Sequence, residues 1–84
     1  MRDFLINTVK FARNNCLDNI AEKYSCENGD TIVIKGGINK NLANVSILKI
    51  EKGKLFSSYT SPTISIELSD KNIEEKIDEV LLNL

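Results

Sequence analysis

The hydrophobic period changes twice along this chain of 84 residues, and the change limits what the chain can fold into. Residues 2–24 repeat apolar side chains at helical spacing, residues 31–68 alternate them with polar ones, and residues 70–84 return to helical spacing. Spacing of about 3.6 residues is typical of a helix with one buried face, and alternation is typical of a strand. The pattern therefore predicts an α+β protein.

The predicted fold is a single domain over residues 1–84: an N-terminal helix, a four-stranded antiparallel meander and a C-terminal helix, with both helices packed on one face of the sheet. We expect strands at 31–35, 44–51, 54–59 and 63–68. Gly36-Gly37 opens a predicted loop, and Lys52-Gly53 is a predicted two-residue hairpin turn. That turn pairs Ile50 with Leu55 and Lys49 with Phe56.

The second helix is predicted to begin at a cap formed by Ser69 or Asp70. Its apolar residues share one face at helical spacing. They are Ile73, Ile77, Val80, Leu81 and Leu84.

The first predicted helix has a broad apolar face and two phenylalanines that do not belong to it. The apolar face comprises Leu5, Ile6, Val9, Ala12, Cys16, Leu17, Ile20 and Tyr24. Phe4 and Phe11 point almost opposite, among Asn7, Thr8 and Asn15. Exposed phenylalanines at this spacing are typical of a protein interface, whereas a helix buried on two sides would place both rings in the core. The wheel leaves both alternatives open.

The predicted hairpin also places apolar side chains on both faces of the sheet. One face carries Leu48, Ile50, Leu55 and Tyr59, and the other carries Val45, Ile47 and Phe56 together with Lys49. A sheet with one solvated face usually alternates more cleanly. We therefore add Lys49 and Phe56 to the candidate partner-binding residues, which are Phe4, Asn7, Thr8, Phe11, Asn15, Lys49 and Phe56.

The residue types argue against several kinds of chemistry. The chain has no histidine, which rules out a Ser-His-Asp triad and a His-ligated metal. If the first helix runs through Cys16 and Cys26, their Cα atoms lie roughly 15 Å apart, beyond disulfide reach. Cys16 would then be a buried thiol, and we expect both cysteines to be reduced. No catalytic residue, metal or cofactor is predicted, and the lack of a signal-like segment favours a cytoplasmic location.

Charge is polarised along the sequence. Residues 30–66 hold five lysines against Asp30 and Glu51, whereas residues 67–84 hold six acids against two lysines. Lys35, Lys40, Lys49, Lys52 and Lys54 are expected to form a weakly basic surface. Nucleic-acid binders usually carry a stronger basic excess with stacking aromatics, so nucleic acid is the less favoured partner.

The sequence thus predicts a small non-enzymatic protein-binding module, acting as an inhibitor, an adaptor or a self-associating subunit such as a homodimer. Its many Asn, Ile and Lys residues suggest a bacterial or viral source, including phages and other mobile elements. Two alternatives stay open. One is a nucleic-acid binder that uses a lysine-bearing sheet, and the other is a small enzyme that uses carboxylates or a cysteine.

Overall fold

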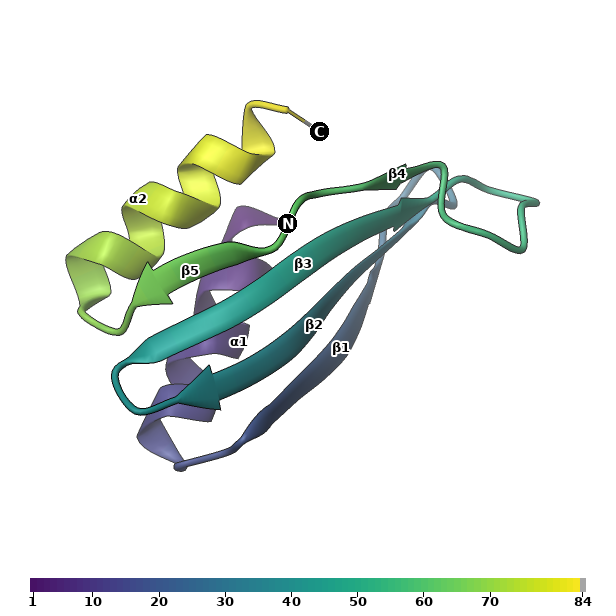
Figure 1. Cartoon of the computed structure of the whole chain (residues 1–84). Coiled ribbons are helices and arrows are strands. Elements are labelled where there is room, and N and C mark those ends of the chain that lie inside the picture. The colour runs from purple at the N-terminus through teal and green to yellow at the C-terminus, as the bar shows by residue number, and fades with distance from the viewer. Residues whose placement is uncertain (84) are drawn as a thin grey trace.

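The computed structural model describes residues 1–83 and shows two helices on one face of an antiparallel sheet (Figure 1). This confirms the predicted α+β class and the placement of the helices at the two ends of the chain. In chain order the elements are α1 (Arg2–Asn14), β1 (Asn19–Ser25), β2 (Thr31–Asn39), β3 (Leu42–Ile50), β4 (Tyr59–Thr60), β5 (Ile64–Glu67) and α2 (Asp70–Leu81).

The sheet is a meander whose last strand is broken. β1 pairs with β2 and β2 with β3, and both β4 and β5 pair with β3. Because Thr60 lies opposite Leu48 and Ile64 lies opposite Val45, the fourth strand carries one extra residue in a bulge that contains Pro62. β4 and β5 are therefore two pieces of one strand, and β1 forms the opposite edge of the sheet.

The core lies between the sheet and the two helices. Strand residues that alternate toward the helices are buried, and α1 packs against β1, β2 and α2, while α2 also packs on β5. The buried apolar residues are Leu5, Ile6, Val9, Ala12, Ile20, Ile32, Ile34, Ala43, Val45, Ile47, Ile66, Ile73, Ile77 and Val80. The other face of the sheet has no helix over it (Figure 1).

The first helix ends much earlier than its apolar spacing predicts. The N–H of Leu17 donates to the carbonyl of Ala12 at 2.9 Å and that of Cys16 to Arg13 at 3.3 Å, which is the Schellman pattern of a helix end. Cys16 occupies the left-handed position, with φ of 53°. The expectation of a helix over residues 15–24 is therefore wrong, and Cys16 is exposed rather than buried.

The predicted loop at Gly36-Gly37 is also wrong, because both glycines lie inside β2. A Cβ atom on Gly36 would fall directly against the carbonyl oxygen of Asn44 on β3. The glycine thus permits a close approach of two strands, and the chain reverses at Lys40-Asn41 instead.

The turn at Lys52-Gly53 is present, since the N–H of Lys54 donates to the carbonyl of Glu51 at 3.0 Å. The strand predicted after it at 54–59 is absent until Tyr59. With Ile50 opposite Leu55, Ile64 would fall opposite Asn41, beyond the end of β3. The observed register instead places Ile64 opposite Val45 and keeps the residues of β5 on the core, so residues 51–58 are left as a loop.

The second helix follows the sequence prediction closely. Ser69 is the N-cap, and its side chain accepts a hydrogen bond from the N–H of Asn72 at 3.2 Å. Ile73, Ile77 and Val80 are buried, and Leu81 packs against them, whereas Leu84 lies outside the described residues.

Two arginines of α1, Arg2 and Arg13, form ion pairs with α2 at the exposed sides of the helices. The Arg2 guanidinium binds Asp78 at 2.6 Å and that of Arg13 binds Asp70 at 2.6 Å. The hydrogen bond from Arg2 lowers the pKa of Asp78, and the one from Arg13 lowers the pKa of Asp70. Within residues 1–83, neither helix is long and apolar enough to cross a membrane.

Candidate binding groove beside an edge strand

β1 is an edge strand with one row of unpaired backbone groups. The Asp18 carbonyl accepts from the N–H of Ile38 at 3.0 Å, and the N–H of Cys26 donates to Asp30 at 2.8 Å. Because the direction of the backbone groups alternates along a strand of an antiparallel pair, the N–H and C=O groups of the even-numbered residues between these two bonds point toward β2. The odd-numbered residues point their N–H and C=O groups away from the sheet. They are Asn19, Ala21, Lys23 and Ser25, and in the part of the chain that the structure describes no hydrogen bond reaches them there.

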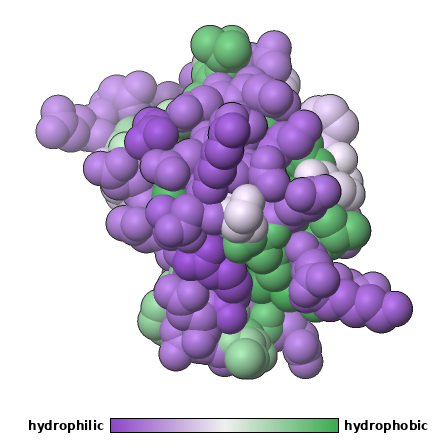
Figure 2. Space-filling model, turned by 90° about the vertical axis from the view of Figure 1, so that its left-hand side faces the viewer, coloured by the Kyte–Doolittle hydropathy of each residue, from purple (hydrophilic) through white to green (hydrophobic). Residues whose placement is uncertain are grey.

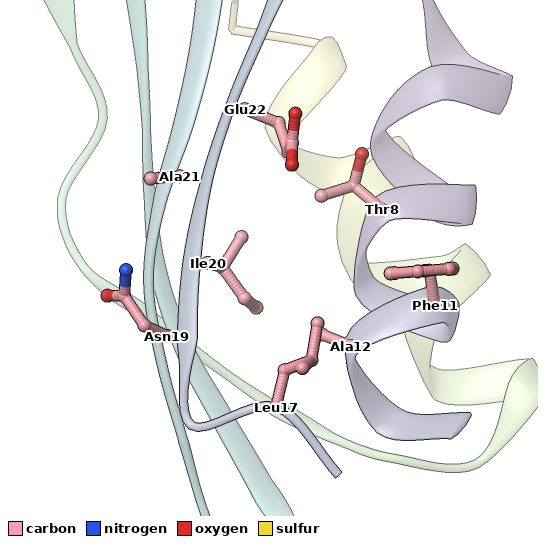
Figure 3. A pocket seen from close by; sticks show the side chains of 8 residues that line it. All are labelled: Thr8, Phe11, Ala12, Leu17, Asn19, Ile20, Ala21 and Glu22. Carbon is pink, nitrogen blue, oxygen red and sulfur yellow. The ribbon is translucent and has the colours of Figure 1, made fainter. Parts of the chain in front are cut away.

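A hollow of about 220 Å³ lies between this strand and α1 (Figure 3). Its lining comes from one side of α1 and from the segment that enters β1. The lining residues are Thr8, Phe11, Ala12, Leu17, Asn19, Ile20, Ala21 and Glu22. We call this hollow the α1–β1 groove.

The groove has an apolar floor and partly exposed apolar walls. Ala12 and Ile20 are buried at its base, whereas Leu17 is 40% exposed and Phe11 is 61% exposed. Asn19 and Ala21 point to the other side of the strand (Figure 3). Exposed apolar side chains around a concave site are typical of a surface that binds another molecule.

Phe4 packs against the core and is not among the residues that line the groove. Its ring contacts Tyr24, with the ring centroids 5.2 Å apart. Phe4 lies one helical turn before Thr8 on α1, and Tyr24 lies two residues after Glu22 on β1. The helix and the strand therefore contact each other beyond this end of the groove. The solvent-facing position expected for Phe4 is therefore wrong, and the one expected for Phe11 is confirmed.

Two acidic side chains flank the apolar part of the groove. Glu22 lines it and points toward Thr8 (Figure 3), and Asp18 precedes the strand. Both are exposed, and among the described residues neither belongs to an ion pair. Asp18 and Glu22 stand two residues on either side of Ile20; Glu22 lines the groove itself, and Asp18 lines the neighbouring hollow that shares Ala12 and Leu17 with it.

The other candidate residues on α1 surround this site without all entering it. The Thr8 hydroxyl lines the groove and donates to the carbonyl of Phe4 at 2.8 Å. The Asn15 amide donates to the carbonyl of Phe11 at 2.9 Å, and both Asn15 and Asn7 are exposed. Of the candidate residues on α1, Thr8 and Phe11 therefore line the groove together.

Lys49 and Phe56 do not lie opposite each other as the hairpin prediction requires. Lys49 pairs with Tyr59, and its half-buried ammonium lies 3.9 Å from Asp30. Phe56 is 83% exposed and neighbouring Leu55 is 89% exposed in the 51–58 loop. This loop projects from the end of the sheet opposite the start of β1 (Figure 1).

Sequence reasoning missed the strand side of the groove, because Leu17, Ile20 and Glu22 were assigned to a helix. Ile20 and Tyr24 share one side of a strand as well as one side of a helix, so their spacing gave no signal for either. The asparagines at positions 14 and 15 were a signal for a helix end, since Asn is common where helices stop.

The five lysines of the central segment do not form one basic surface. Lys40 lies at the turn between β2 and β3, and Lys52 and Lys54 lie at the opposite end of the molecule. Lys35 lies between them on the sheet face away from the helices, and Lys49 lies on the helix side. Viewed from the end that carries the turn between β2 and β3, the surface of the molecule is largely hydrophilic, with a narrow apolar strip (Figure 2).

Within residues 1–83, no three Cys, Asp or Glu side chains come together in a way that could hold a metal ion. A comparison of the chain with protein-family models, curated proteins and solved structures finds no significant match. The functional proposal therefore rests on the geometry of the groove.

Proposed function

We propose that this chain is a non-enzymatic protein-binding module that holds an extended segment of its partner in the α1–β1 groove. The observation that carries the proposal is the coincidence of two features in one place. The outward row of backbone groups on β1 runs beside an apolar groove that leaves Phe11 exposed. Addition of a strand to a sheet edge is a common mode of peptide recognition.

The outward backbone groups of β1 and the side chains of the groove contribute differently to recognition. Backbone groups of Asn19, Ala21, Lys23 and Ser25 can pair with any extended chain, so they contribute affinity without selecting a sequence. Side chains of the added strand alternate, so every second one enters the groove beneath the edge. An apolar side chain there covers Phe11 and Leu17, and its neighbour two positions away meets Glu22 or Asp18. The preferred partner is therefore a segment in which apolar and basic side chains share one face.

This mode suits an inhibitor or an adaptor, whose activity consists of occupying a partner. As the sequence suggests, we place that activity in the cytoplasm of a bacterial or viral system. Nucleic acid remains the alternative partner, but the dispersed lysines support it less than the groove supports a peptide.

Selection of binders from a random peptide library on the immobilised chain tests the proposal. The enriched peptides should carry an apolar residue and a basic residue two positions apart, so that both side chains lie on one face. A synthetic copy of one should bind the chain in titration calorimetry, and Phe11→Ser should weaken binding at least about tenfold, which is about 1.4 kcal/mol. The matched control is Leu82→Ser, which removes an exposed leucine (87%) outside the groove and should leave affinity unchanged.

Circular dichroism of both variants verifies that they are folded. Peptides that bind Phe11→Ser as tightly as the unchanged chain would contradict the proposal. Failure to enrich any peptide with an apolar and a basic residue two positions apart would contradict it as well.

A further inference from the structure

We propose that the groove's own partner is the 51–58 loop of a second copy, so that copies of this chain associate head to tail. This inference rests on the proposed function, because it names the extended segment that the groove accepts. It requires that the loop can act as a strand, that its side chains complement the groove, and that one chain cannot satisfy its own groove.

The loop has the composition of a strand without the pairing of one. Residues 54–59 are predicted as a strand from the sequence, yet in the single chain the ladder with β3 begins at Tyr59. Leu55 and Phe56, the two large apolar residues of the loop, are almost fully exposed. An exposed Leu-Phe pair in a segment with unpaired backbone is a liability unless another surface covers it.

The side chains of the loop match those of the groove. In an extended segment Lys54 and Phe56 lie on the same side, because they are two residues apart. When the Phe56 ring sits over Ile20, it contacts Phe11 and Leu17 and covers apolar surface on both copies. Lys54 then lies two positions from Ile20, opposite either Asp18 or Glu22. Both positions are acidic, so the charges match whichever way the added strand runs.

The two surfaces lie at opposite ends of the sheet. The groove is beside the start of β1, which pairs with the end of β2, whereas the loop follows the end of β3 (Figure 1). The longest dimension of the molecule is 37 Å. A chain therefore cannot place its loop in its own groove. The contact uses different surfaces on the two copies, so it adds copies in a row or closes a ring, of which the smallest is a dimer with two reciprocal contacts.

Sedimentation velocity of the full chain across concentrations up to the millimolar range tests the association. We expect the average mass to rise with concentration above that of a single chain, and to fall when salt is added because Lys54 faces a carboxylate. Phe11→Ser, which damages the groove, and Phe56→Ser, which damages the loop, should each be monomeric. Leu82→Ser should associate like the unchanged chain.

The decisive experiment mixes the Phe11→Ser and Phe56→Ser variants. The Phe11→Ser chain still offers an intact loop and the Phe56→Ser chain still offers an intact groove, so an equimolar mixture should form a dimer and stop there. Circular dichroism of each variant verifies folding before it is mixed.

A monomeric unchanged chain at millimolar concentration would overturn the inference, as would a mixture that stays monomeric. Association that survives Phe56→Ser would also overturn it and would indicate pairing of β1 with β1 instead. These outcomes are separate from the proposed function, because the peptide titration uses dilute protein. Peptide binding by a chain that does not self-associate would retain the function and reject this partner.

Discussion

At the scale of single residues, the two phenylalanines of α1 have different surroundings. Phe4 is half-buried against Tyr24, whereas Phe11 faces solvent above the groove. We expect Phe4→Ser to lower the free energy of unfolding by about 1–3 kcal/mol and Phe11→Ser to change it by less than about 0.5 kcal/mol. Urea unfolding followed by circular dichroism measures both. Equal losses would show that Phe11 also belongs to the core.

Cys16 is strained by its place at the end of α1. Its φ of 53° lies in the left-handed region, where glycine carries no steric penalty. Cys16→Gly should therefore raise the free energy of unfolding by about 0.5–1 kcal/mol. Asn15, with φ of −107°, is the matched control, and Asn15→Gly should destabilise the chain. Thermal unfolding of the two variants side by side measures the difference, and a loss for Cys16→Gly would refute the assigned helix end.

The ion pair between Arg2 and Asp78 gives the protein an acid-sensitive contact between its helices. Its hydrogen bond lowers the pKa of Asp78 in the folded chain from the ordinary 3.8. The contact therefore stabilises the fold above pH 3.8, and that contribution is lost as pH falls through the lowered folded pKa. Asp78→Asn should lose stability at neutral pH and show a flatter acid limb in urea midpoints measured against pH. An acid limb equal to that of the unchanged chain would mean that the pair contributes nothing.

At the scale of elements, β1 should tolerate proline at alternate positions. The N–H of Ala21 points away from the sheet and that of Glu22 points toward β2. Ala21→Pro thus removes no ladder bond and should leave the chain folded, whereas Glu22→Pro should destabilise it by roughly 3 kcal/mol. Ala21→Pro should nevertheless abolish peptide binding, because it deletes a donor that the added strand needs. Thermal unfolding and calorimetry of both variants provide the readout, and the opposite order of stability would reverse the assigned edge.

Elements that lie wholly within one hydrophobic period could be predicted from the sequence. The dense β-branched residues of 31–35 identify the first half of β2, and the predicted strand at 44–51 identifies most of β3. The Ser69 cap with the Ile73–Ile77 spacing identifies α2. In each of these elements, the spacing of the element's own apolar side chains is sufficient to define the face that is buried.

The remaining elements depend on contacts distant in sequence. Apolar residues from Leu17 to Tyr24 fit a helical spacing as well as a strand, and pairing with β2 decides between them. Residues 54–58 follow a turn signal and include Leu55 and Phe56, which favours a strand, but the burial of Ile66 fixes a register that excludes them. For the site, Phe11 was visible from the sequence because it interrupts a polar face, whereas its groove was not, because the other wall belongs to the missed strand.

At the scale of the whole molecule, binding in the groove requires no rearrangement of the core. The helices stabilise one face of the sheet, and the groove lies at the rim where α1 stops covering β1. An added strand would extend the sheet from its free edge, and the residues that bury the core would keep their places. The partner's contribution should therefore be visible in the backbone of β1 itself.

Amide hydrogen exchange of the Phe56→Ser chain, whose groove is intact, measured residue by residue by NMR with and without a saturating library-selected peptide, tests the central claim most directly. Without peptide, the outward amides of β1 should exchange fast and the inward amides of Ile20, Glu22 and Tyr24 slowly. With peptide, the account predicts that the outward amides, those of Asn19, Ala21, Lys23 and Ser25, also become slow. If they still exchange fast when the peptide is fully bound, no strand has been added at β1 and the account is contradicted.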